Sequence, residues 1–352
     1  MHPFRKLLLI SLGRASSFDK TPSERDWQFL YSMARSQSLQ GVLYGAILRL
    51  ETEQRPPEPL LGHWKEIAER IAAIYARHEE HVKELEPLLE RLHLQGCILK
   101  GTSLSHLYPV PSERICGDID LWIKGKRADI INAFRQEGHP LKDILYKEGK
   151  VDLFPDTELE IHFHPSKMYN PFLNARLQRV LEKWAPFDGK APLTYPDMRF
   201  NAVFCMAHMF HHYLEGGLGL RQLMDYYYVM RSLDPSLRQP VMDTLRRLGM
   251  KRFTASIMAA LWYNFGLEEE FFLCPPDIIH GKKLVNDMIS MGNFGALDPR
   301  NYTYDGESAI KRFLRKNRRI FSNIRYYPRE VIWAPFSKVS QWCRRRLHGY
   351  EK

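Results

Sequence analysis

The sequence contains few cysteines, and none of them is paired at a metal-binding spacing. The five cysteines of the 352 residues stand far apart, at positions 97, 116, 205, 274 and 343. This scatter argues against a zinc site and against a disulfide framework, and it is typical of proteins in a reducing compartment. We therefore expect a cytoplasmic protein.

Long apolar runs are also missing. No segment approaches the roughly 20 apolar residues that cross a bilayer, so the sequence predicts no transmembrane segment. The start, Arg5-Lys6-Leu7-Leu8-Leu9-Ile10, has a short apolar run that Arg14 soon follows. This pattern favours an amphipathic first helix over a signal peptide.

The composition is that of a globular protein with uneven charge. Hydrophobic residues make up 44% and charged residues 26% of the chain, and its length allows a large core in two or three lobes. The net charge is +10, and residues 301–352 hold 13 Lys and Arg against four Asp and Glu. Nearly all of the imbalance therefore lies in the C-terminal tail.

Periodicity divides the chain into helical and α/β parts. We predict four regions: an N-terminal helical region over 1–86, an α/β lobe over 87–165, a helical domain over 166–300 and a basic tail over 301–352. In the first region, residues 26–50 and 60–94 carry apolar residues at helical spacing. Pro87 is expected to divide the second stretch, because proline lacks the N–H that a helix interior needs.

The α/β lobe is predicted from short apolar runs and turn residues. The expected strands are 97–99, the segment around 118–123, 143–146, 151–154 and 158–163, with a helix over 127–137. Pro155-Asp156-Thr157 would form the turn of a hairpin between the last two strands. Beyond this lobe the predicted helices are 201–213, 221–232, 235–248 and 252–265.

Two motifs in this lobe carry the chemistry. Cys97 to Leu99 lead into a turn at Lys100-Gly101, and Gly101 permits a close approach that a side chain would block. Asp118 and Asp120 then alternate along an apolar strand, so both carboxylates point to the same face. Two adjacent like charges need a cation between them, and Mg²⁺ prefers such oxygen ligands.

This combination resembles the active site of polymerase-beta-like nucleotidyltransferases. The motifs Leu99-Lys100-Gly101, Arg114, Gly117-Asp118-Ile119-Asp120 and Leu159-Glu160-Ile161-His162 are similar to those of a bacterial branch of that superfamily, the uncharacterised nucleotidyltransferase family. The resemblance implies an α+β fold: a small mixed-sheet lobe flanked by N- and C-terminal helical regions. It departs at Lys100-Gly101-Thr102, where the superfamily usually has Gly-Gly or Gly-Ser, and the gap from Gly101 to Asp118 is longer than usual.

The resemblance also implies a third metal-binding carboxylate. It favours Glu160, in a segment of period two that puts Glu158, Glu160, His162 and His164 on one face. Asp152 is the alternative, on an adjoining predicted strand. We therefore expect Asp118, Asp120 and Glu160 to bind Mg²⁺ or Mn²⁺ and to be catalytic, with Glu160 also assisting deprotonation of an acceptor hydroxyl.

Candidate phosphate-binding residues surround these carboxylates. They are Lys100, Gly101, Thr102, Ser103, Arg114 and Arg221. Thr102 and Ser103 can cap a helix that extends to Leu107, whose first N–H groups would bind phosphate. Lys100 could instead be a surface lysine at the end of a strand. Arg114 could instead pair with an acidic residue of the site or lie on the surface.

A second cluster lies in the helical domain. His208 and His212 are four residues apart, as are Arg221 and Asp225, so each pair shares a helix face. The spacing of the histidines occurs in zinc sites, but position 209 is Met and not the Glu of His-Glu-x-x-His. We expect these residues to form a wall of the pocket, with a polar network in the core as the alternative.

The tail has basic residues around much of a helix at 311–319, with Phe313, Leu314 and Ile320 as apolar neighbours, and a further basic run at Arg344-Arg345-Arg346. Trp333, Phe336 and Trp342 lie among them. RNA phosphates or an anionic membrane surface are the expected partners of such a segment, and solvated surface charge is the alternative.

The function favoured by the sequence is metal-dependent transfer of a nucleoside monophosphate from an NTP to a hydroxyl acceptor, with release of pyrophosphate. The sequence identifies neither the base nor the acceptor, which could be a small molecule, a sugar, a protein or RNA. A catalytically inactive nucleotide-binding protein of the same fold, a tail-directed RNA- or membrane-associated protein and a phosphotransferase remain alternatives.

Overall fold

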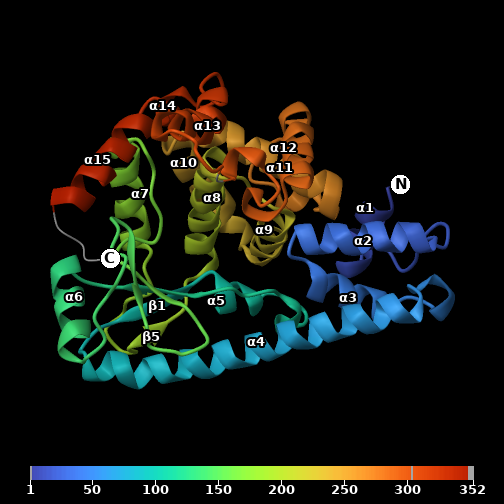
Figure 1. Cartoon of the computed structure of the whole chain (residues 1–352), viewed down its shortest axis with the longest axis horizontal. Helices are drawn as coiled ribbons and strands as arrows, with labels where there is room; N and C mark the ends of the chain where they lie inside the picture. Colours follow the sequence, from blue (N-terminus) through green and yellow to red (C-terminus); the bar gives the residue numbers. More distant parts are fainter. Residues whose placement is uncertain (1, 303, 348–352) are drawn as a thin grey trace.

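A small mixed sheet lies at one end of the molecule, and helices flank it on both sides (Figure 1). The computed structural model describes residues 2–302 and 304–347, without the side chains of residues 309, 316 and 341–347. The predicted α+β fold is confirmed.

The sheet has five strands in the order β3-β4-β2-β1-β5. They are β1 (Gly96–Leu99), β2 (Ile119–Ile123), β3 (Glu148–Val151), β4 (Leu159–His162) and β5 (Leu193–Thr194). β1 runs antiparallel to β2 and parallel to β5, whereas β2 runs parallel to β4 and β4 antiparallel to β3. The parallel pairing of β2 with β4 places Asp120 directly opposite Glu160.

Alternation along the strands gives the sheet two apolar faces. Ile119, Leu121 and Ile123 of β2 belong to a smaller core, together with Leu159 and Ile161 of β4. The smaller core is covered by α6 (Arg127–Gln136) and by the C-terminal half of α4 (Glu58–Arg91). The opposite face contributes Cys97, Leu99 and Trp122 to the large core of the helical part. Asp120 and Glu160 lie on this second face because side chains alternate along a strand.

The N-terminal part consists of α1 (Pro3–Ser11), α2 (Glu24–Ser36), α3 (Gln40–Leu48), the short 3₁₀ turn η1 (Thr52–Gln54) and the first half of α4. The stretch with helical spacing over 26–50 forms two helices, α2 and α3. The break follows from the backbone between them, where Gln37 caps α2 and Ser38 has a φ of +54°. A residue in this left-handed conformation cannot continue a right-handed helix.

The prediction that Pro87 divides the long helix is wrong. α4 runs unbroken over 34 residues with Pro87 inside it, and Figure 1 shows it along one whole side of the molecule. Pro87 and Lys83 both lie on the exposed side of the helix. Water can therefore hydrate the Lys83 carbonyl that proline leaves without a partner.

Two of the predicted strands differ from the structure: one is absent and one is displaced. Residues 143–146 form no strand, and only an isolated bridge between Lys142 and Lys150 lies beside them. The strand predicted at 151–154 lies at 148–151, because the antiparallel register pairs Val151 with Leu159 and leaves the following residues for the turn. The hairpin itself is confirmed. β5, with two residues, was not predicted.

The helices of the following part are α7 (Pro171–Lys183), α8 (Met198–Glu215), α9 (Leu220–Ser232), α10 (Pro235–Arg247), α11 (Lys251–Phe265) and α12 (Ile278–Met291). Helices α8 to α11 agree closely with the four predicted helices, whereas α7 and α12 were not predicted individually. α8 is buried along most of its length and lies near the centre of the molecule (Figure 1). A helix surrounded on most sides needs apolar residues around most of its circumference, which α8 has.

The C-terminal segment packs onto these helices. It comprises α13 (Ala309–Ser322), α14 (Pro328–Val331) and α15 (Ala334–Leu347). The Arg319 Nε donates a 2.7 Å hydrogen bond to the Tyr213 carbonyl, and the Tyr213 hydroxyl donates one of 3.1 Å to Asn323. The first part of the tail is thereby attached to α8. In the described part of the chain, no helix is long and apolar enough to span a membrane.

Candidate active site

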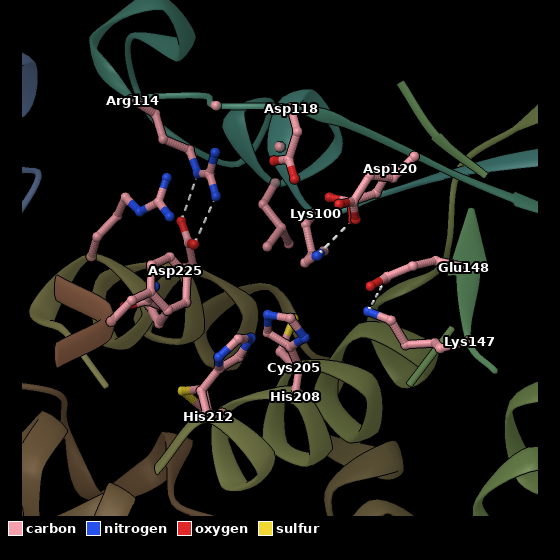
Figure 2. Close-up of a pocket in the computed structure, with 18 residues that line it drawn as sticks. Lys100, Arg114, Asp118, Asp120, Lys147, Glu148, Cys205, His208, His212 and Asp225 are labelled. Carbon is pink, nitrogen blue, oxygen red and sulfur yellow. Dashed lines mark hydrogen bonds and ion pairs between the residues drawn. The ribbon is translucent and has the colours of Figure 1, made fainter. Parts of the chain in front are cut away.

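A cavity of about 280 Å³ lies between the sheet face that carries Asp120 and Glu160 and the helices α8 and α9. Figure 2 shows Asp118, Asp120 and Lys100 on the sheet side and His208 and His212 on the helical side. Of the residues predicted for the site, ten line the cavity: Lys100, Gly101, Arg114, Asp118, Asp120, Glu160, His208, His212, Arg221 and Asp225. Residues from distant parts of the sequence are therefore brought together.

The turn after β1 has an unusual backbone. Lys100 has a φ of +46° and Gly101 a φ of +37°. A Cβ atom at Gly101 would lie 3.3 Å from the Asp118 carbonyl oxygen, so glycine allows the turn to approach the segment that enters β2. For Lys100, which has a Cβ, a positive φ is a local strain of order 1 kcal/mol.

Thr102 and Ser103 do not line the cavity. Both are buried in α5 (Gly101–Ser105), which is shorter than the helix predicted to reach Leu107. Their phosphate-binding role stays a prediction.

Asp120 is the most deeply buried carboxylate of the site. Its Oδ1 lies 2.7 Å from the Lys100 Nζ and 2.7 Å from the His162 Nε2. Burial alone would raise the pKa of Asp120, but Lys100 and His162 outweigh it and hold that pKa below its usual range. Burial alone would likewise lower the pKa of Lys100, but the attraction of Asp120 raises it. Asp120 and Lys100 are thus a charged pair.

Asp118 lies just before β2, on the same face as Asp120. The negative charge of Asp120 raises the pKa of Asp118 to about 6, and burial adds to the effect. Two carboxylates that repel each other in this way favour a bound cation. The carboxylates of Asp118 and Asp120 therefore repel each other at close range, as the Asp-x-Asp spacing predicted.

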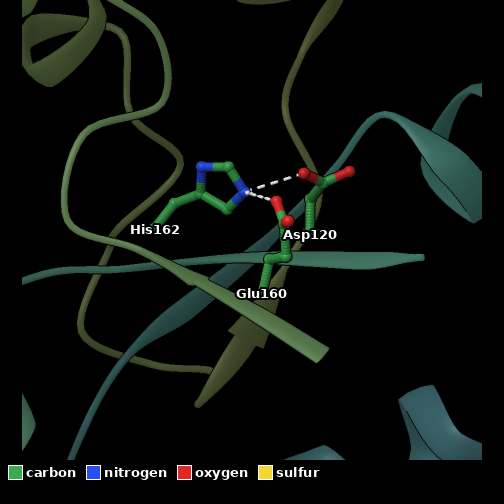
Figure 3. Close-up of side chains that lie close together, drawn as sticks. All are labelled: Asp120, Glu160 and His162. Atoms are coloured by element: carbon green, nitrogen blue, oxygen red, sulfur yellow. Dashed lines mark hydrogen bonds and ion pairs between the residues drawn. The ribbon is translucent and has the colours of Figure 1, made fainter. Parts of the chain in front are cut away.

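Glu160 and His162 come from β4 and extend this acidic group. Figure 3 shows the two side chains beside Asp120. The His162 Nε2 lies 3.4 Å from the Glu160 Oε2, and ligand atoms of Asp120, Glu160 and His162 all lie within 4.8 Å of one another. The carboxylate oxygens of Asp120 and Glu160, together with those of Asp118, fit a hard divalent cation such as Mg²⁺ or Mn²⁺.

Asp152, the alternative third carboxylate, lies elsewhere. Its side chain is 72% exposed and pairs with Lys142, and it does not line the cavity. The geometry therefore favours Glu160 as the third acidic residue of the site.

His162 and a second ion pair were not among the predicted site residues. His162 is fully buried, and the period of two over 158–164 already placed it on the face of Glu160. Lys147 and Glu148 line the cavity and form an ion pair with a 2.5 Å Nζ–Oε2 distance. They were missed because they lie between the strands predicted at 143–146 and 151–154, whereas β3 begins at Glu148.

Arg114 forms a buried ion pair with Asp225. Its Nε and Nη2 donate hydrogen bonds of 2.7 and 2.8 Å to the two carboxylate oxygens, and the Tyr108 hydroxyl donates a third of 2.7 Å. Asp225 therefore pairs with Arg114 and not, in any contact we observe, with Arg221. Of the roles considered for Arg114, the structure therefore shows pairing with an acidic residue of the site.

The remaining residues form the helical wall. Burial, reinforced by the positive charge of Lys100, holds the pKa of His208 well below its usual range, and burial does the same for His212. Both histidines are therefore neutral near pH 7. Arg221 donates a 2.8 Å hydrogen bond to the Ile115 carbonyl, and its Nε has no hydrogen-bond partner among the described residues.

An Asp-x-Asp strand after a glycine turn, with a third carboxylate on the parallel neighbouring strand, is the arrangement that the resemblance to nucleotidyltransferases predicted. Comparison with protein families agrees with this geometry: the family model described as uncharacterised nucleotidyltransferase matches residues 23–264. The chain belongs to this family. No curated protein and no solved structure shows significant similarity to it.

The basic tail is only partly available to a partner. Arg315 pairs with Glu307, and Arg319 is buried against Tyr213 and Asp298. Lys311 and Arg318 are exposed. The side chains of Trp342 and of 344–346 lie outside the described residues. Contact of the tail with RNA or an anionic membrane stays a prediction.

Proposed function

We propose that the protein is a metal-dependent nucleotidyltransferase, which transfers a nucleoside monophosphate from an NTP to a hydroxyl group and releases pyrophosphate. The observation that carries this proposal is the cross-strand pairing of Asp120 with Glu160, with Asp118 two residues earlier, in one cavity. Membership of a nucleotidyltransferase family supports the reaction type.

Asp118, Asp120 and Glu160 would hold one or two Mg²⁺ or Mn²⁺ ions. When bound, such ions neutralise the charge of the triphosphate and acidify a nearby hydroxyl. On this side of the cavity, two lysines face four carboxylates, which gives an excess of negative charge that suits a divalent cation. The lysines are Lys100 and Lys147, and the carboxylates are those of Asp118, Asp120, Glu148 and Glu160.

The residues of the chain act by position and charge, as is general in phosphoryl transfer. The acceptor oxygen forms a bond to the α-phosphorus while the bond from that phosphorus to the bridging oxygen of the β-phosphate breaks. Glu160 accepts the proton of the acceptor hydroxyl. Lys100, beside Asp120, attracts the phosphate groups, and the neutral His208 and His212 form the opposite wall.

The test is incubation with each α-³²P-labelled NTP, Mg²⁺ or Mn²⁺, and a cell extract. The variants Asp118→Asn and Asp120→Asn preserve side-chain shape, and Asp152→Asn is a matched control because it removes an exposed carboxylate of the same lobe. We expect labelled product from the wild type and from Asp152→Asn, and none from the other two. Transfer of the γ-phosphate with release of ADP would identify a phosphotransferase instead.

A second candidate, a nucleotide-binding protein without turnover, is favoured by one observation. The Lys100 ammonium group lies 2.7 Å from Asp120 and so neutralises a carboxylate that a metal ion would need. Under this alternative, calorimetry would detect NTP binding of equal affinity with EDTA and with Mg²⁺, and no pyrophosphate would form.

A further inference from the structure

A loop beyond the family-matched region completes the cavity. Phe294 lies in the short turn η4 (Asn293–Gly295), lines the cavity and is 38% exposed. The family model ends at residue 264. Among the described cavity-lining residues, Phe294 is the one with a phenyl, phenol or indole ring.

The backbone of this loop is held in a fixed and strained conformation. Phe294 has φ and ψ of +52° and +25°, a left-handed conformation that is costly for a residue with a Cβ. A Cβ at Gly295 would lie 2.0 Å from the Gly216 carbonyl oxygen, so the loop contacts the α8–α9 connection directly. The Asn301 amide donates hydrogen bonds of 2.9 and 3.0 Å to the carbonyls of Gly216 and Gly295.

The ring of Phe294 is positioned by two residues of the helical wall. Its centroid lies 4.8 Å from that of the His212 ring, and the Arg221 guanidinium lies 5.5 Å from its centroid. These contacts hold the ring in the wall while part of it remains exposed. Exposure of a large aromatic ring inside a cavity is a common feature of ligand sites.

We propose that Phe294 is the stacking surface for the base of the bound nucleotide. The proposal rests on the proposed function, which assigns the triphosphate to the carboxylate side of the cavity. The base is the opposite end of an NTP and would extend toward the helical wall, where Phe294 lies with His212 and Arg221. Every base has a π face, so stacking on an aromatic ring binds any base and does not read the hydrogen-bonding groups at its edge.

The test compares ligands with and without a base. Dissociation constants are measured by calorimetry for the four NTPs and for inorganic tripolyphosphate, each with Mg²⁺, on the wild type and on Phe294→Leu and Phe294→Trp. Leucine keeps apolar volume but has no ring face, whereas tryptophan keeps one. Thermal unfolding of each variant reports whether the loop change affects the fold.

We expect Phe294→Leu to weaken NTP binding about tenfold or more and to leave tripolyphosphate binding unchanged, with Phe294→Trp close to the wild type. NTP should quench the tryptophan fluorescence of Phe294→Trp more than that of the wild type. Tripolyphosphate should cause no such difference between the two proteins. Equal NTP affinity in Phe294→Leu and the wild type, or an equal loss for tripolyphosphate, would overturn the stacking role alone. Failure of the wild type to bind any NTP would overturn the proposed function as well.

Discussion

Arg114 and Asp225 join the sheet lobe to the helical part through a buried ion pair with two hydrogen bonds, of 2.7 and 2.8 Å. The residues are 111 positions apart, and both side chains are less than 10% exposed. Burial would raise the pKa of Asp225, but Arg114 lowers it. The pair therefore fixes the geometry of one side of the cavity.

Asp225→Asn should destabilise the protein by about 3–5 kcal/mol, because it leaves the Arg114 charge buried and unpaired. Urea unfolding measures the change. The control Asp152→Asn, in an exposed pair with Lys142, should leave stability almost unchanged. Replacing both partners, Arg114→Met with Asp225→Leu, should cost less than Asp225→Asn alone; an equal or larger cost would contradict the desolvation argument.

Lys100→Met should increase the affinity for Mn²⁺ about tenfold, because the ammonium group competes with a metal ion for the Asp120 carboxylate. Electron paramagnetic resonance of free Mn²⁺ measures this without turnover. Lys147→Met is the matched control, since it removes an equal charge from the cavity but pairs with Glu148. Unchanged or weaker Mn²⁺ binding in Lys100→Met would show that Lys100 does not compete.

Gly41→Ala should destabilise the protein by about 1–3 kcal/mol through overpacking. A Cβ at Gly41 on α3 would lie 2.2 Å from the Glu113 carbonyl oxygen, in the backbone that leads into Arg114. At Gly62 on α4 no atom lies within 4 Å of an added Cβ, so Gly62→Ala should stabilise by roughly 0.5–1 kcal/mol through helix propensity. Thermal or urea unfolding of both variants checks the opposite signs.

Glu330 should make stability decrease as the pH rises. Burial raises its pKa to about 7 although the Tyr169 and Asn170 amides donate hydrogen bonds to it and lower the pKa. The folded state thus holds a proton that the unfolded state releases near pH 4.5. The contribution is complete below about pH 4.5 and is lost as the pH rises through about 7, by at most roughly 3 kcal/mol.

Urea unfolding of the wild type and Glu330→Gln between pH 4.5 and 8 measures this component. The variant is expected to be less stable, because its amide NH₂ faces a backbone donor, and to lack the part of the pH slope that Glu330 supplies. Parallel slopes in the two proteins would rule out titration of Glu330 in this range.

The sequence predicted the sheet lobe well where local pattern decides the structure. The alternation of Asp118 and Asp120, and of Glu160 and His162, placed each pair on one face of its strand, and in the structure Asp118, Asp120 and Glu160 line the cavity with His162 in contact with Asp120. Their catalytic roles stay predictions. Helices α8 to α11 were predicted for the same reason, because their apolar spacing extends over several turns.

Features that depend on tertiary contacts were not predictable in the same way. No local signal shows that Arg114 pairs with Asp225 or that Phe294 reaches a cavity formed by residues before 226. Pro87 lies inside α4 although proline usually interrupts a helix. Its position on the exposed side of α4 leaves the unpaired Lys83 carbonyl accessible to water. The register with β4 moved β3 to Glu148–Val151 and brought Glu148 into the site.

Helix α4 contributes to both apolar cores, with Leu60 and Trp64 in the large one and Leu85 and Leu89 in the smaller one. Either core can lose its packing only if part of the same hydrogen-bonded helix is also released. The two cores should therefore unfold in one cooperative transition, with hydrogen-bonded backbone amides in the N-terminal and C-terminal halves of α4 showing similar hydrogen-exchange protection. We therefore expect the single continuous helix to make the sheet lobe and the N-terminal helices one thermodynamic unit.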